Sequence, residues 1–164
     1  MRHDALTDAM IDLFSQDAKR INHFLKVYAF AQTIALQEKV NAELQDIIEA
    51  VAICHDIGIR ISEKKYGNCT YEMQQTEGPP EARKLLSQLC YPEKLIDRVC
   101  HIIVLHHTLD AVEGVDFRIL VEADLLVNLD EKRADAERIE SMRSQAFRTK
   151  TGLRYLSALF PSPR

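Results

Sequence analysis

Apolar residues recur at intervals of three and four along most of this 164-residue sequence, a spacing that indicates amphipathic helices. Glycine and proline number only five each, so few positions interrupt such helices. Alternation typical of strands is nearly absent. We therefore predict an all-α helical bundle. Its helices are expected near residues 4–16, 18–38, 41–57, 79–90, 92–107, 117–130, 132–147 and 151–160.

Some predicted helix ends carry residues that favour them. Asn41 can cap a helix that begins at Ala42, because its side chain can accept a hydrogen bond from a backbone N–H of the first turn. Proline suits the first turn of a helix, where its missing N–H costs nothing, so Pro79 or Pro80 and Pro92 are expected there.

The stretch from Ile59 to Gly78, IRISEKKYGNCTYEMQQTEG, is the exception to the helical pattern. It is polar and carries Gly67 and Asn68 near its middle. We interpret it as a long connection, and connections of this length within a compact domain are commonly functional. It is either a lid or wall beside a site or a plain surface loop.

Length and composition limit the kinds of protein that this sequence can specify. The length fits one domain, and 46% hydrophobic with 28% charged residues is the balance of a globular protein. No apolar run is long enough to cross a membrane and the start lacks a signal-peptide core, so we expect a cytoplasmic location. A net charge of -4 argues against an extended nucleic-acid surface. The four cysteines lack CxxC spacing, so they suggest neither a zinc ribbon nor a redox motif.

Histidines and one aspartate fall on helix faces that should be buried. Apolar residues stand three, four and seven positions before each of His55, His106 and Asp124. His23 has Val27 four positions after it, on an apolar stripe of its own helix. His107 is turned by about 100° from His106, so either His106 alone or both can face inward.

Each of these residues has an ordinary interpretation when taken singly. A lone histidine on an apolar face is usually a hydrogen-bonded core residue, and a lone inward aspartate is usually a cap or half of an ion pair. Here four separate helices each direct a histidine or aspartate inward, and no lysine or arginine lies on those faces to neutralise the acids. A bound divalent cation would satisfy imidazoles and carboxylates together.

The motif formed by His23, the pair His55-Asp56 in the sequence HDIG, and Asp124 resembles the H…HD…D signature of the HD-domain superfamily of metal-dependent phosphohydrolases. The resemblance covers residues 18–130. It implies a single HD domain over residues 1–164, with C-terminal helices near 132–160 and one or two central divalent ions (Mn, Fe, Ni, Co, Mg or Zn). His23, His55, Asp56 and Asp124 would bind the first ion.

The same resemblance implies a second ion, with Asp56 as the bridge and His106 and His107 as further ligands. Many members with two metals add a histidine where this sequence has Glu77, in TEGPPEARKLL. Glu77 would then contribute a carboxylate oxygen or, like Asp56, accept a proton from the attacking water. His101 lies off the inward face and is interpreted as structural or supporting.

The implied activity is hydrolysis of a small phosphate ester (a nucleotide, phosphomonoester or phosphodiester) by water that the metal activates. Arg60, Lys64 and Lys65 either hold the substrate phosphate or form a solvated basic segment. Two alternatives use the same scaffold: a di-iron oxygenase, and a non-catalytic module that binds a nucleotide or a partner protein. A homodimer is expected only from the general frequency of such assemblies.

Overall fold

The computed structural model describes residues 3–161, and all regular secondary structure within that range is helical. The all-α prediction is therefore confirmed. No helix in this range is both long and apolar enough to span a membrane. The helices are α1 (Asp4–Leu13), α2 (Ala18–Gln37), α3 (Ala42–Cys54), α4 (Gly58–Tyr66), α5 (Tyr71–Gln88), α6 (Glu93–Leu105), the short 3-10 helix η1 (Leu109–Ala111), α7 (Gly114–Glu131), α8 (Ala136–Gln145) and α9 (Lys150–Leu159).

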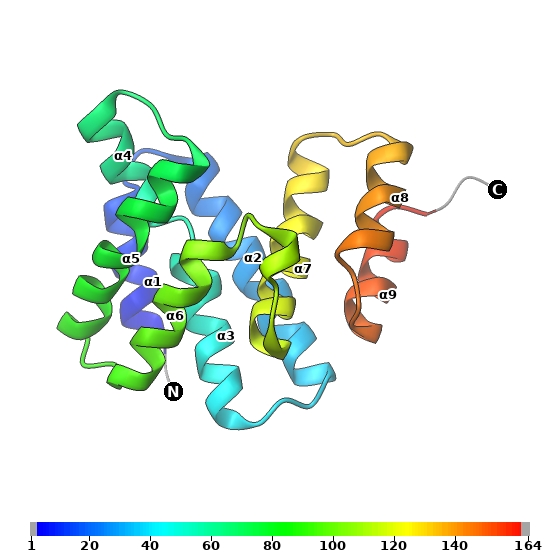
Figure 1. Ribbon diagram of the computed structural model, residues 1–164, viewed down its shortest axis with the longest axis horizontal. Helices are drawn as coiled ribbons and strands as arrows, with labels where there is room; N and C mark the ends of the chain where they lie inside the picture. Colours follow the sequence, from blue (N-terminus) through cyan, green and yellow to red (C-terminus); the bar gives the residue numbers. More distant parts are fainter. Residues whose placement is uncertain (1–2, 162–164) are drawn as a thin grey trace.

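Helices α2, α3 and α7 pack against one another at the centre of the bundle. Figure 1 shows α4, α5 and α6 on one side of this central group and α8 and α9 on the other. The predicted apolar stripes meet in the core, where Phe24, Ile48 and Phe117 are fully buried. Burying such side chains contributes about 1.5–3 kcal/mol each, and this burial holds the three helices that carry the inward polar residues.

Side-chain caps fix the starts of several helices. The Asn41 carboxamide oxygen accepts the backbone N–H of Leu44 at 2.9 Å, as predicted. The fully buried Glu122 of α7 accepts the backbone N–H groups of Arg148 and Thr149 at 2.7 and 2.9 Å. This carboxylate therefore ties the start of α9 to α7 and fixes the adjoining end of α8.

The prediction of a loop from Ile59 to Gly78 is wrong, because most of this stretch forms α4 and the first half of α5. Gly67 ends α4 in the left-handed conformation, with φ 76°, and the Thr70 hydroxyl caps α5. The inward face of this pair is polar rather than apolar, and its buried residues include Gln74 and Glu77. A helix with such a face lacks the apolar period on which the prediction depended.

The two prolines do not start a helix either. Pro79 and Pro80 lie within α5, which is continuous from Tyr71 to Gln88. Two adjacent prolines would weaken this helix in isolation. The contacts of α5 with α4 and α6 stabilise it.

Gly58 and Gly78 let α4 and α5 approach closely. A Cβ atom on Gly58 would lie 2.8 Å from the backbone nitrogen of Gly78 and 2.9 Å from its Cα. We therefore expect Gly58→Ala to lower the free energy of unfolding by about 1–3 kcal/mol, because backbone atoms must move apart. Urea denaturation measures the change, with Lys64→Ala on the exposed face of α4 as the control. Equal stability of the two variants would contradict this packing.

Candidate metal centre

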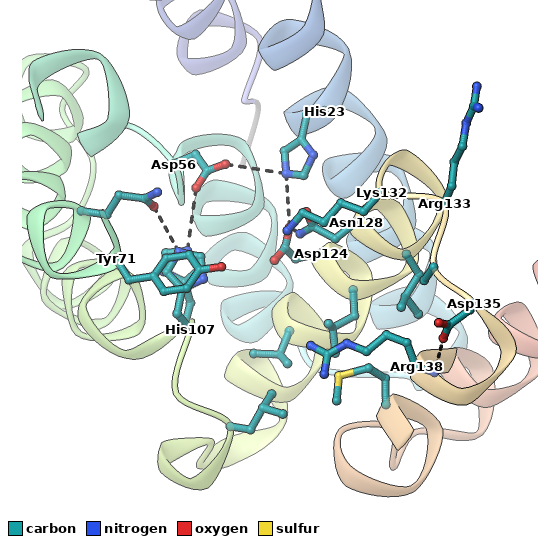
Figure 2. Close-up of a pocket in the computed structure, with 18 residues that line it drawn as sticks. His23, Asp56, Tyr71, His107, Asp124, Asn128, Lys132, Arg133, Asp135 and Arg138 are labelled. Carbon is teal, nitrogen blue, oxygen red and sulfur yellow. Dashed lines mark hydrogen bonds and ion pairs between the residues drawn. The ribbon is translucent and has the colours of Figure 1, made fainter. Parts of the chain in front are cut away.

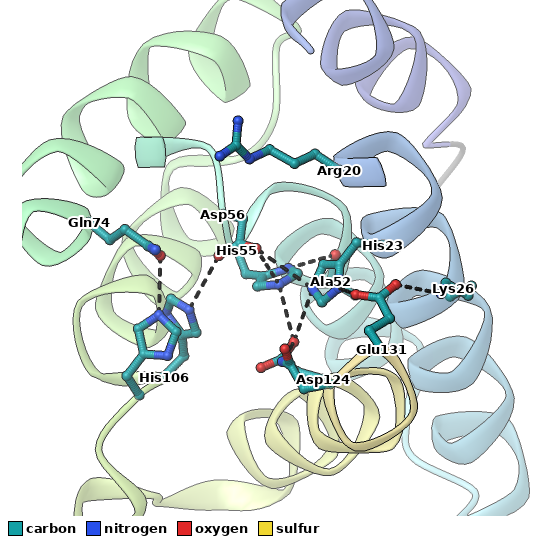
Figure 3. A network of polar contacts seen from close by, with 12 residues as sticks. Arg20, His23, Lys26, Ala52, His55, Asp56, Gln74, His106, Asp124 and Glu131 are labelled. Atoms are coloured by element: carbon teal, nitrogen blue, oxygen red, sulfur yellow. Dashed lines mark hydrogen bonds and ion pairs between the residues drawn. The ribbon is translucent and has the colours of Figure 1, made fainter. Parts of the chain in front are cut away.

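Three central helices bring four of the predicted ligands together. His23 comes from α2, His55 and Asp56 follow the last turn of α3, and Asp124 comes from α7. The Nε2 atom of His23 lies 3.2 Å from Oδ1 of Asp124 and 3.7 Å from Oδ2 of Asp56. The Nε2 atom of His55 lies 3.5 Å from Oδ2 of Asp56 and 3.7 Å from Oδ1 of Asp124. Figure 3 shows these side chains pointing toward one another.

The imidazole rings are held by their Nδ1 atoms. The Nδ1 atom of His55 donates to the carbonyl of Ala52 at 3.0 Å, and that of His106 donates to the carbonyl of Ile103 at 2.8 Å. Because a carbonyl only accepts, Nδ1 carries the proton and the neutral ring keeps a lone pair on Nε2. Both Nε2 atoms are buried and have no hydrogen-bond partner. A metal ion would satisfy them.

A carboxylate orients the third ring. The Nδ1 atom of His23 lies 2.9 Å from Oε2 of Glu131, and the other oxygen of this carboxylate, Oε1, pairs with Lys26 (Figure 3). A carboxylate on the outer nitrogen of a ligand histidine fixes the ring and strengthens the inner nitrogen as a donor. Asn128 acts similarly on the aspartate, donating to Oδ1 of Asp124 at 2.7 Å.

The carboxylates make this centre attract positive charge. Burial opposes ionisation of Asp56 and Asp124, but the neighbouring histidines outweigh it and hold the pKa of each carboxyl well below its usual range. Burial opposes protonation of His55, yet Asp56 and Asp124 raise the pKa of this imidazole to about 9. Without a cation, Nε2 of His55 therefore carries a proton, which a bound metal ion would displace. The two acids therefore remain charged, as the ligands of a divalent cation must be.

A second group of donors adjoins the first through Asp56. Donor atoms of Asp56, His106 and His107 lie within 4.8 Å of one another, and Nε2 of His106 is 3.8 Å from Oδ1 of Asp56. His107 has its Nε2 atom 3.1 Å from the Gln74 side-chain oxygen and its ring against Tyr71. Burial and the adjacent His106 lower the pKa of His107 to about 4, which keeps this ring neutral. Both histidines thus face the centre.

A cavity of about 640 Å³ opens onto both groups. His23, Asp56, His106, His107 and Asp124 line one end, and residues of α7 and α8 line the other (Figure 2). This volume is typical of sites for small molecules.

The remaining predicted site residues lie outside this cavity. Arg60 and Lys64 are exposed on α4 and do not line it, and Lys65 pairs instead with Glu77. The Glu77 carboxylate also accepts the hydroxyl of Tyr66 at 2.7 Å. The structure therefore does not bring Arg60, Lys64, Lys65 or Glu77 to the predicted metal ligands. His101 is also exposed and lies 3.3 Å from Glu113, on another part of α6.

The position of Glu77 has a direct consequence for turnover. Glu77→Gln keeps the size of the side chain and removes only a charge that faces Lys65 and Tyr66. We expect kcat and KM to change by less than about threefold, because Glu77 does not line the cavity, although the weakened pair should lower the stability slightly. Steady-state kinetics on the folded variant measures this. A loss of a hundredfold or so would return Glu77 to the catalytic site.

Sequence reasoning missed several residues around the site. Asn128 and Glu131 stand four and seven positions after Asp124, on the same face of α7, so their helical spacing carried a usable signal. Gln74 lay within the stretch interpreted as a loop. Lys132 and Arg138 reach the cavity from the end of α7 and from α8.

This fold and site define an all-helical domain with two adjacent clusters of histidine and aspartate that can hold metal ions. The chain matches the family model of the HD domain over residues 20–140, and it belongs to that family.

Among solved structures, the chain is similar to a protein from an uncultured Thermotogales bacterium, described as a predicted HD superfamily hydrolase. The two share 22% sequence identity, with a TM-score of 0.69 over 96% of this chain and 85% of the other. A comparison with curated proteins finds no match.

Proposed function

We propose that this protein is a metal-dependent phosphohydrolase that cleaves a small phosphate ester. The observation that carries the proposal is the pair of buried Nε2 atoms, on His55 and His106, that have no partner and face Asp56 from its two sides. Buried polar atoms are normally satisfied, so such atoms beside ionised carboxylates favour a cation site. The description of the Thermotogales protein as a hydrolase agrees with this reaction class.

His23, His55, Asp56 and Asp124 would hold one ion, and Asp56, His106 and His107 a second. A divalent ion bound there lowers the pKa of water and polarises a phosphoryl oxygen. Asp56 presents Oδ2 to His23 and His55 and Oδ1 to His106, which suits a bridge between the two groups. Its low pKa favours a role as a permanently ionised ligand over one as proton acceptor.

Neighbouring groups of the protein orient the histidine side chains that would bind the metal ions. Ala52 and Ile103 hold the rings of His55 and His106 with their Nε2 atoms toward Asp56, and Glu131 holds the ring of His23 with its Nε2 atom toward Asp124. The burial of the His55 and His106 rings limits access of water to the face of the site that is open to the cavity. A phosphate ester that enters the cavity would meet the ligands from that side.

Metal analysis of the purified protein, followed by assays on p-nitrophenyl phosphate and a nucleotide panel, tests the proposal. Manganese, nickel, cobalt and magnesium should each be added to separate samples. We expect bound metal and release of phosphate that is equally fast with and without dioxygen. Turnover that requires dioxygen would favour the oxygenase alternative. Bound metal without any phosphate release across the panel would count against phosphohydrolysis.

A further inference from the structure

The cavity extends beyond the metal ligands, and its far end is positively charged. Lys132, Arg133 and Arg138 line this end, where Asp135 is the acidic lining residue. Within residues 3–161 the structure gives the side chains of Lys132 and Arg138 no ion pair, whereas Arg20 and Arg98 elsewhere each pair with two carboxylates. The whole chain carries a net charge of -4, so this cationic end is a local feature.

The side chains differ in direction. Figure 2 shows Lys132 extending toward Asp124 and Arg138 extending from α8 in the same general direction, whereas Arg133 extends away from both. Leu125 of α7 and Met142 of α8 also line the cavity. The far end therefore combines two inward cations with an apolar wall.

Helix electrostatics account for Lys132 but not for Arg138. Lys132 caps the C-terminus of α7, where a positive charge is favoured by the helix dipole. Arg138 lies in the first turn of α8, where the dipole favours a negative charge, as Glu137 supplies. Asp135 accepts the backbone N–H of Arg138 rather than pairing with its guanidinium. Arg138 is exposed and has no ion pair within the described residues, and because it lines the cavity its guanidinium is available to bind an external anion there.

We infer that Arg138, assisted by Lys132, binds a second negatively charged group of the substrate at the α8 end of the cavity. This inference rests on the proposed function, in which the scissile phosphate lies at the metal ligands. The substrate would then be a phosphate ester whose leaving group carries a further phosphate or carboxylate, joined through a part that packs on Leu125 and Met142. A guanidinium suits either anion, because both accept its parallel N–H groups.

Alkyl phosphonates test this inference without turnover, since their C–P bond is not hydrolysed. Isothermal titration of the metal-loaded protein compares alkyl monophosphonates with α,ω-diphosphonates of the same chain lengths. A third series, ω-carboxyalkyl phosphonates, distinguishes a carboxylate from a second phosphate. We expect the second charge to tighten binding by about tenfold or more at a favoured length. Arg138→Gln should remove most of this gain, and Lys132→Gln part of it.

Arg133→Gln is the matched control, because it removes an adjacent charge at the edge of the cavity whose side chain extends away from Lys132 and Arg138, and it should keep the gain. Equal binding of single and double anions at every chain length would overturn the second subsite and leave the proposed function intact. A gain that persists in Arg138→Gln would also overturn it. Absence of binding by monophosphonates would overturn the proposed function, and this inference with it.

Discussion

Replacing Asp124 with asparagine is expected to lower kcat/KM for a phosphate ester by about a hundred- to a thousandfold or more. The substitution keeps the shape of the side chain and leaves its oxygen able to accept from Asn128, but it removes the charge that faces His23 and His55. A neutral amide binds a divalent ion more weakly than a carboxylate does, so both metal content and turnover should fall. Steady-state kinetics and metal analysis of the same preparation measure the two effects.

Asp130→Asn provides the matched control, because Asp130 is an exposed aspartate on the same helix. It should retain both metal and activity. Far-ultraviolet circular dichroism of both variants should match that of the unaltered protein, since neither change reaches the apolar core. If Asp124→Asn kept its metal and its rate, α7 would contribute no ligand.

Removing the metal is expected to lower the melting temperature by roughly 5–15 °C. A ligand that binds only the folded state stabilises the protein by about 2.7–4.1 kcal/mol when its free concentration is 100 to 1,000 times its dissociation constant. Each kcal/mol of stabilisation shifts the melting temperature by about 2–4 °C. Without a cation, the charges of Asp56 and Asp124 are balanced only by the histidines around them. Differential scanning calorimetry before and after chelation measures this shift.

Adding the metal back should restore the original melting temperature, and Asp124→Asn should show a smaller shift than the unaltered protein. The comparison separates loss of a specific ligand from a general effect of the chelator. A melting temperature that does not respond to chelation would indicate that the polar cluster is satisfied within the protein alone.

The sequence predicted the helices whose buried faces are apolar. Ile48 and Val51 on α3, and Phe117 and Leu120 on α7, place His55 and Asp124 in the interior, and the structure buries both. A period of 3.6 residues is sufficient to assign such faces. The way in which the helices pack against one another depends on contacts between distant segments. The apolar pattern of a single helix does not specify those contacts.

Helix α4 and the first half of α5 were missed because the contact between the two helices is made by unusual residues. Glycine at 58 and 78 allows close approach without an apolar stripe, and the buried Glu77 carboxylate is paired with Lys65 and accepts a hydrogen bond from the Tyr66 hydroxyl. Each of these residues taken alone favours a loop or a surface. Only their pairing across two helices makes them compatible with a packed face.

The site was predictable to the extent that its residues share a helix face with core residues. The anchors of the rings, the carbonyls of Ala52 and Ile103, are backbone atoms, and no residue type signals them. Lys132 and Arg138 belong to the end of one helix and the start of the next, so their common direction depends on the turn between α7 and α8. Sequence spacing alone does not determine that direction.

A crystal structure with anomalous scattering recorded at the metal edge tests the central claim most directly. The account predicts an anomalous peak about 2.1 Å from Nε2 of His55, with His23, Asp56 and Asp124 completing the coordination. A crystal grown with manganese or nickel that shows no peak there, with Nε2 of His55 bonded to ordered water instead, would contradict it.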